Sequence, residues 1–246
     1  MNSTLSGPIA NTAGVPQGRQ TKKLTVELGY IIEKCELNDF IIEFSFASHD
    51  CIDDICNVVN WAFRGKPSST NQLEIYCGWI CEEHLVSGKR ILPHQLKKYI
   101  DRMEQNKHNP DEVIIVVKLI NKDLADKKQI VGSIQISLYD STLQPLEEKE
   151  NGIAVEFGLV AVDPDYQSKG IGTLMYGVAV NISKEYFNAK RVYLLVVSSK
   201  TNQINWKIRQ GFTHTGRYVS FPVDSEHIPK VDTELLKLAV LTKILA

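Results

Sequence analysis

A glycine-containing turn at residues 163–172 is the segment of this chain best suited to bind an anion. The apolar run 153–162 leads into Asp163-Pro164, and Gly170 and Gly172 follow directly before a helical pattern. Backbone N–H groups at a helix start and the positive end of its dipole both favour a phosphate. Glycine lets the backbone approach such a ligand closely. The turn therefore predicts a site for a phosphorylated ligand.

Two well-known phosphate-binding loops do not fit this turn. A P-loop requires Gly-x-x-x-x-Gly-Lys-Ser/Thr, which occurs nowhere in the chain. A dinucleotide-binding fingerprint requires Gly-x-Gly-x-x-Gly, but the glycine that follows Gly172 is Gly177, two positions too late. The turn must therefore be compared with another type of phosphate-binding loop.

The hexapeptide 167–172, Gln-Ser-Lys-Gly-Ile-Gly, matches Gln/Arg-x-x-Gly-x-Gly/Ala and resembles the acyl-CoA pyrophosphate loop of the GNAT acetyltransferase family. Its context is similar to that family as well. The run 159–164 resembles the strand that enters the loop, and 130–134 resembles the strand before it. Gly211-Phe212 resembles a late Gly-Phe marker. The resemblance extends from about Phe40 to the C-terminus.

The resemblance implies an α/β (α+β) fold of the acyl-CoA N-acyltransferase type, with a mixed, twisted sheet of about seven strands flanked by helices. Strands 153–162 and 191–197 are expected to splay apart and to hold the pantetheine arm of acetyl-CoA, the acyl donor, between them. The implied donor contacts are backbone groups at Val160, Val162, Gln167, Ser168, Lys169, Gly170, Ile171 and Gly172. Asn202 is a further candidate contact, and it could also be a helix N-cap.

The reaction implied is direct transfer of the acetyl group to a primary amine in a ternary complex. The amine must lose a proton, and Glu156 is the candidate base because it interrupts an otherwise apolar strand. Partial desolvation would raise the pKa of this carboxyl group toward a useful value. The alternative is that Glu156 faces solvent or pairs with a lysine.

The proton donor to the leaving thiolate is left open. Many family members carry a tyrosine four residues before the Gly-Phe marker, but Lys207 stands there in this chain. A second alignment, counted from Asn202, places Arg209 at that position. Water, Tyr218, Tyr193 or the charge of Lys207 are the alternatives.

The acceptor is also left open. The long segments 65–110 and 221–233 could enclose a small-molecule amine, and His227 in the second segment could contact it. Acetylation of a protein N-terminus or of a lysine is the alternative, and so is a non-catalytic acyl-CoA-binding module. A homodimer is not excluded.

Composition argues against several other classes. The net charge of −1 gives no reason to expect a nucleic acid or an anionic membrane as a partner. Five cysteines without a Cys-x-x-Cys pair, and histidines without ligand spacing, predict neither disulfides nor a metal site. All five cysteines precede residue 82, so a cysteine-linked acetyl intermediate is not favoured. No secretory or membrane-spanning segment is recognisable, and a cytoplasmic protein is expected.

The periodicity of apolar residues predicts a disordered tail over 1–25 and one domain over 26–246. Within it we expect helices from residue 48 or 50 to 64, from 69 or 70 to 86, over 93–106 and 202–210, and one after the glycine turn whose apolar stripe runs from Ile171 to Ile182. Strands are expected over 40–46, 113–120, 130–139, 153–162, 191–197 and 212–221. Residues 235–244 fit either a strand or a helix. Polar loops are expected over 121–128 and 140–151.

Overall fold

The computed structural model describes residues 25–37, 40–68, 70, 74–121, 128–139, 152–223 and 227–245. Its centre is an eight-stranded sheet in the order β1-β2-β6-β7-β8-β9-β12-β10. The strands are β1 (Ile31–Leu37), β2 (Phe40–Phe46), β6 (Glu112–Asn121), β7 (Lys128–Leu138), β8 (Ile153–Val162), β9 (Ala189–Val197), β10 (Thr213–Val219) and β12 (Leu238–Ile244).

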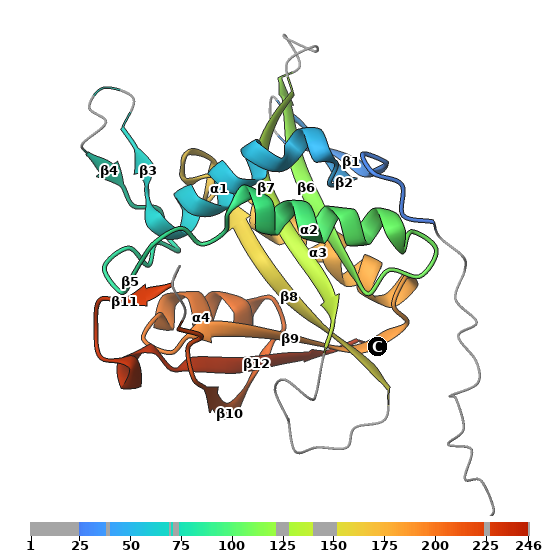
Figure 1. Cartoon of the computed structure of the whole chain (residues 1–246). Coiled ribbons are helices and arrows are strands. Elements are labelled where there is room, and N and C mark those ends of the chain that lie inside the picture. Colours follow the sequence, from blue (N-terminus) through green and yellow to red (C-terminus); the bar gives the residue numbers. More distant parts are fainter. Residues whose placement is uncertain are drawn as a thin grey trace, which may run out of the picture.

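Helices cover both faces of this sheet (Figure 1). Helices α1 (Ile52–Arg64) and α2 (Pro93–Gln105) lie together on one face, over β6, β7 and β8. Helix α3 (Ile171–Glu185) packs against β7, β8 and β9 on the other face. The shorter α4 (Thr201–Arg209) lies beside α3, because Trp206 meets Tyr176 edge to face at 5.2 Å.

The strand β8, the crossover helix α3 and the strand β9 form a βαβ unit, and β8–β9 is the parallel pair in a sheet whose other pairs are antiparallel. A parallel pair needs such a crossover. The mixed sheet flanked by helices confirms the predicted fold class. The sheet has one strand more than expected, the edge strand β1 (Ile31–Leu37). This strand was not predicted because its side chains are partly charged and largely exposed and show no clear alternation of apolar and polar residues.

The helix predicted from residue 69 or 70 to 86 is wrong. The described part of this segment forms β3 (Lys66–Pro67) paired with β4 (Ile75–Tyr76), then turns, then β5 (Val86–Ser87) paired with β11 (Ile228–Pro229). These pairings with distant residues override the weak local helical preference. Residues 235–244 form the short helix η3 (Thr233–Leu236) and then β12, so the strand alternative holds over its second part.

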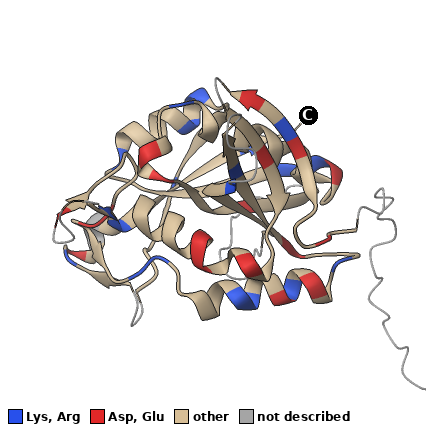
Figure 2. Cartoon of the chain, turned by 90° about the horizontal axis from the view of Figure 1, so that it is seen from above, with Lys and Arg blue, Asp and Glu red and all other residues tan. Residues whose placement is uncertain are grey.

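Of the loop predicted over 121–128, the end residues Asn121 and Lys128 belong to β6 and β7, and 122–127 lie outside the described residues. The loop predicted over 140–151 and residues 1–24 of the predicted tail also lie outside them. Acidic and basic side chains are interspersed over the helices and strands (Figure 2). No helix within the described ranges is long and apolar enough to cross a membrane.

Candidate active site

The site begins where β8 and β9 part. Their parallel pairing runs from Ile153↔Ala189 to Glu156↔Tyr193 and then stops, although both strands continue, to Val162 and Val197. Strand β8 stays paired with β7 on its other side. The splayed strands that the sequence predicted are therefore present, and Glu156 stands at the point of divergence.

A β-bulge in β8 lies directly beyond this point. Ser133 pairs with Ala161 and Gln135 with Gly158, so β8 has one residue more than β7 between the two pairs. Leu159 takes a positive φ of 46° here. A bulge of this kind bends the strand and redirects its side chains. Further along, the N–H of Asp163 donates to Val131 of β7 at 2.8 Å. Since successive N–H groups alternate in direction along a strand, that of Val162 points to the side that β9 has left.

The glycine turn ends β8 and begins α3. Gly170 is the N-cap, with φ 89° and ψ −13°, a left-handed conformation that glycine adopts without strain. Ser168 also has a positive φ, of 61°. Within the described residues, the backbone N–H groups of 168–172 make no hydrogen bond to the protein. They form a cluster of free donors at a helix N-terminus, which suits an anion.

A cavity of about 330 Å³ opens over this turn. Of the predicted donor contacts, six line it: Val160, Val162, Gln167, Ser168, Gly170 and Gly172. The other three do not. Ile171 is buried in the core, Lys169 is exposed with its Nζ 5.0 Å from the ring centroid of Tyr166, and Asn202 is exposed on the first turn of α4.

The side chain of Gln167 holds a separate loop over this cavity. Its Nε2 donates to the carbonyl of Val162 at 2.9 Å, and its Oε1 accepts from the N–H of Trp79 at 2.6 Å. Gly78 lies so close that a Cβ there would be 2.8 Å from Oε1 of Gln167. Trp79 in turn meets Trp206 edge to face at 5.8 Å, and both rings line the cavity.

A buried ion pair fixes the start of the same turn. Asp163 is fully buried and accepts from Nζ of Lys66 at 2.8 and 2.9 Å. Lys66 also contacts Asp165 at 2.5 Å, and its Nζ lies 4.6 Å from the ring centroid of Trp61. The two carboxylates raise the pKa of Lys66 in spite of its burial. The turn is thereby tied to the segment that follows α1.

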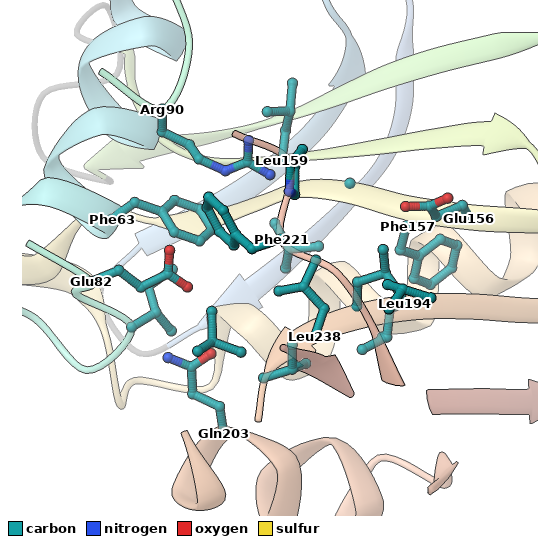
Figure 3. Close-up of a pocket in the computed structure, with 18 of the residues that line it drawn as sticks. Phe63, Glu82, Arg90, Glu156, Phe157, Leu159, Leu194, Gln203, Phe221 and Leu238 are labelled. Carbon is teal, nitrogen blue, oxygen red and sulfur yellow. The ribbon is translucent and has the colours of Figure 1, made fainter. Parts of the chain in front are cut away.

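A second and larger cavity, of about 700 Å³, contains Glu156 (Figure 3). Burial raises the pKa of the Glu156 carboxyl group, and the positive charge of Arg90 opposes that rise in part. A carboxyl group with a raised pKa is a better proton acceptor than an ordinary surface glutamate. Glu156 thus lines a cavity and does not pair with a lysine, and its role as a base stays a prediction.

The two cavities share four lining residues: Ile80, Val160, Tyr176 and Lys207. Lys207 is buried, and its Nζ donates to the hydroxyl of Tyr176. Burial lowers the pKa of Lys207 to about 7. An ammonium group with such a pKa can give up its proton near neutral pH. Of the candidates for the acid, Lys207 alone lies at the junction of the two cavities.

The other candidate acids lie elsewhere. Arg209 lines the smaller cavity, and Tyr218 lines the larger one with 53% of its surface exposed. Tyr193 lines neither and packs on Tyr139 at 4.7 Å between ring centroids. His227 lines the larger cavity, as predicted for a residue near the acceptor. The five cysteines, all of them described and all free thiols, line neither cavity.

Sequence reasoning missed four polar residues of the larger cavity: Glu82, Arg90, Gln203 and Ser220. Glu82 and Arg90 come from the 65–110 segment, where the helix prediction was wrong, and Gln203 comes from α4. No local pattern marks them, because only the tertiary fold brings these distant segments to the cavity that Glu156 also lines. The described residues contain no group of three or more side chains arranged to bind a metal ion.

Comparison with known proteins agrees with this geometry. A model of the acetyltransferase (GNAT) family matches residues 79–212, whereas no curated protein sequence matches. A putative acetyltransferase from Acinetobacter baylyi is similar in structure, with a TM-score of 0.53, 14% identity, and coverage of 84% of this chain and 94% of that chain. A spermidine N-acetyltransferase mutant from Vibrio cholerae has a TM-score of 0.50 and 14% identity, covering 82% and 94%. A GNAT acetyltransferase from Streptococcus pneumoniae has a TM-score of 0.50 and 9% identity, covering 83% and 99%. The family match spans more than half of the chain, which therefore belongs to the GNAT acetyltransferase family and is by family an N-acetyltransferase.

Proposed function

We propose that this protein transfers the acetyl group of acetyl-CoA directly to the primary amine of a small molecule, with both substrates bound at once. One observation carries the proposal. The donor-type cavity at the glycine turn and the cavity that contains Glu156 meet at Val160, Tyr176 and Lys207, where β8 and β9 part. An acyl donor in one cavity and an amine in the other would have their reacting atoms at this junction.

The donor side fits a long phosphorylated thioester. The free N–H groups of 168–172 suit its pyrophosphate, and Val160 and Val162 lie where its pantetheine arm would run. The lining of the cavity does not include Lys169, Ile171 or Asn202. These residues would therefore contact the donor only through backbone groups or at the entrance of the cavity. Main-chain donors can hold an anion whatever the side chains are. The turn contains polar, charged and apolar side chains, and this mixture is compatible with such a role.

The acceptor side supplies the chemistry of amine attack. Glu156 takes a proton from the ammonium group, and the freed nitrogen attacks the thioester carbonyl carbon. Backbone N–H groups at the bulge are suited to stabilise the oxyanion. The carbon–sulfur bond then breaks, and the Lys207 ammonium group gives its proton to the departing thiolate. The nitrogen loses its second proton to the Lys207 amine as the amide forms, so Lys207 is charged again, and the proton on Glu156 leaves to solvent with the products.

The cover of the larger cavity favours a small acceptor over a peptide. Strand β5 (Val86–Ser87) pairs with β11 (Ile228–Pro229), and Ser87 Oγ also donates to the Ile228 carbonyl at 3.1 Å. Lys230 adds a backbone bond to Leu85 at 2.8 Å and an ion pair with Glu83. These contacts join the two segments that border the acceptor cavity, whereas a peptide would need an open groove.

The first experiment is calorimetric titration of the purified protein with acetyl-CoA, followed by an assay of thiol release with a panel of amines. Micromolar binding and release of coenzyme A with a small amine would support the proposal. Binding without turnover on amines, amino acids or peptides would instead indicate an acyl-CoA-binding module. Turnover limited to peptides would favour a protein acceptor, and a folded protein that binds no acetyl-CoA would refute the proposal.

A further inference from the structure

The acceptor cavity contains charged groups that the reaction itself does not use. Glu82 is 6% exposed, and its carboxylate lies 3.6 Å from the guanidinium of Arg64. Arg64 stands behind the cavity wall and is fixed by a 2.7 Å bond from its Nε to the carbonyl of Gly88. The charge of Glu82 is therefore balanced by Arg64 behind the wall and by Arg90, which lines the cavity.

Two hydrogen-bond donors in the same cavity lack such a partner. Gln203 is 7% exposed, lines the cavity, and its Nε2 has no hydrogen-bond partner among the described residues. The guanidinium of Arg90 also lines the cavity and lies 5.4 Å from the ring centroid of Phe63. Within the described part of the chain, no carboxylate comes within 4 Å of it and no hydrogen bond from it is found. Gln203 is the buried donor of the two, and a buried donor without a partner is costly, so it marks the place of an acceptor group on a ligand. The guanidinium of the half-buried Arg90 offers further donors to the same cavity.

The position of Arg90 is fixed from behind. Its backbone N–H donates to Oδ1 of Asn60 at 2.6 Å, and the Asn60 side chain also donates to the carbonyl of Ile91 at 2.9 Å. The Arg90 side chain points into the cavity at one end, and Glu156 lies toward the other (Figure 3). Phe63 and Phe221 lie beside Arg90, and Leu159, Leu238 and Leu194 lie between that end and Glu156 in this view (Figure 3). The cavity thus has a positive end, an apolar middle and a basic carboxylate.

We propose that the acceptor is an amine that also carries a carboxylate, of the amino-acid class, and that its carboxylate pairs with Arg90 while its amine meets Glu156. This inference rests on the proposed function and specifies its substrate. Arginine binds a carboxylate through two parallel hydrogen bonds, which orients the rest of the ligand. Gln203 donates a further bond to an oxygen of the same ligand.

Charge balance supports a zwitterion over a polyamine. Arg64 and Arg90 both act on the charge of Glu82, and Arg90 acts on Glu156 as well. Once Glu156 is matched by the incoming ammonium group, the two arginines face the single carboxylate of Glu82, which leaves one positive charge in excess. A substrate carboxylate supplies the missing negative charge. A polyamine would instead bring a second positive charge beside Arg90, in a cavity where like charges repel strongly.

The test compares matched acceptors that differ in the carboxylate alone: L-phenylalanine with phenethylamine, L-leucine with 3-methylbutylamine, and L-lysine with cadaverine, with spermidine as a further arm. The wild-type protein should use the amino acid of at least one pair with a kcat/KM roughly 10- to 100-fold above that of its decarboxylated partner. Arg90→Met should remove this preference by raising the KM for the amino acid, with the KM for the simple amine unchanged. Lys89→Met, at the exposed neighbouring position, is the matched control and should leave both unchanged.

Three results would overturn the inference. Equal or better use of the simple amines or of spermidine by the wild-type protein would refute it and leave the proposed function intact. An equal loss of kcat on both members of a pair in Arg90→Met would show that Arg90 acts on Glu156 instead. No turnover of any amine by a protein that binds acetyl-CoA would refute the proposed function itself. The wild-type comparison decides the question even where Arg90→Met does not fold, and Arg90→Lys provides a second variant.

Discussion

The side-chain nitrogen of Lys207 lies 4.4 Å from the ring centroid of Tyr176 and donates a hydrogen bond to the hydroxyl of that tyrosine. Both side chains are buried, and both line the junction of the two cavities. Burial alone lowers the pKa of Lys207 to about 7. Lys207, one of several candidates for the acid in the sequence, thus lies at the junction where the proposed reaction needs a proton donor. Its pKa suits the transfer of that proton to the thiolate.

The proposed roles of Lys207 and Glu156 predict a bell-shaped dependence of kcat on pH. The rate should rise as the Glu156 carboxyl group loses its proton and should fall as Lys207 loses its own, near pH 7. Lys207→Met should lower kcat by about 10²- to 10⁴-fold, because a general acid contributes that much. Lys207→Arg keeps a charge that does not titrate in this range, so its alkaline limb should disappear. An alkaline limb unchanged in both variants would contradict the assignment.

The same lysine should make stability depend on pH. The pKa of Lys207 in the folded protein is about 7, below the roughly 10.4 of an unfolded lysine, so the unfolded chain binds more protons between these values. Stability must then rise with pH across that window. Relative to the wild type, Lys207→Met should be more stable at pH 6 than at pH 9.5, by up to about 4 kcal/mol. Urea unfolding of both proteins at the two pH values measures this difference, and a constant difference would refute it.

Replacement of the candidate base should separate chemistry from binding. Glu156→Gln keeps the shape of the side chain but cannot accept the proton, so kcat should fall by about 10²- to 10⁴-fold. Calorimetry should give the same Kd for acetyl-CoA as in the wild type, because Glu156 lines the acceptor cavity and not the donor cavity. Glu104→Gln, at an exposed position on α2, is the control and should change neither value. Unchanged turnover in Glu156→Gln would assign the base to another group.

The bridge formed by Gln167 should contribute to donor affinity. Gln167→Leu removes the bonds to Val162 and to the N–H of Trp79, which frees the loop that covers the donor cavity. The Kd for acetyl-CoA should rise about 10-fold, as expected for the loss of roughly 1.4 kcal/mol of buried hydrogen bonding. The KM for the amine should change little. Gln129→Leu, which removes only a surface contact with Tyr166, is the matched control. A donor Kd that rises equally in both variants would show that the bridge is not the cause.

The ion pair of Lys66 with Asp163 should matter for stability. Lys66→Met leaves a fully buried carboxylate without its cation, which should lower the free energy of unfolding by about 3 kcal/mol or more. Adding Asp163→Asn should recover part of that loss, because the buried charge is then gone. Lys97→Met breaks an exposed pair with Asp101 on α2 and should cost less than about 1 kcal/mol. Equal losses from the two lysine variants in urea unfolding would contradict this account.

Most of the sheet could be predicted because its strands carry local signals. The apolar runs of β2, β6, β7, β8 and β9 and the helical stripe of α3 are visible in the sequence, and so is the crossover that makes β8 and β9 parallel. The edge strand β1 was missed because its exposed face is charged. The segment between α1 and α2 was misread because its short strands are stabilised by pairing with distant residues, above all β11.

The sequence by itself determined the glycine turn, the strand that enters it and the carboxylate of Glu156, because each depends on residues adjacent in the chain. Gly170 needs a left-handed conformation at one position, and an acidic residue in an apolar strand is visible at once. Tertiary structure alone decided which groups share a cavity with Glu156. Arg90, Glu82 and Gln203 come from distant elements, and the pKa of Lys207 depends on how deeply α4 buries it against α3. Burial and proximity are properties of the packed molecule, so the acceptor cavity and its charges could be known only once the chain was folded.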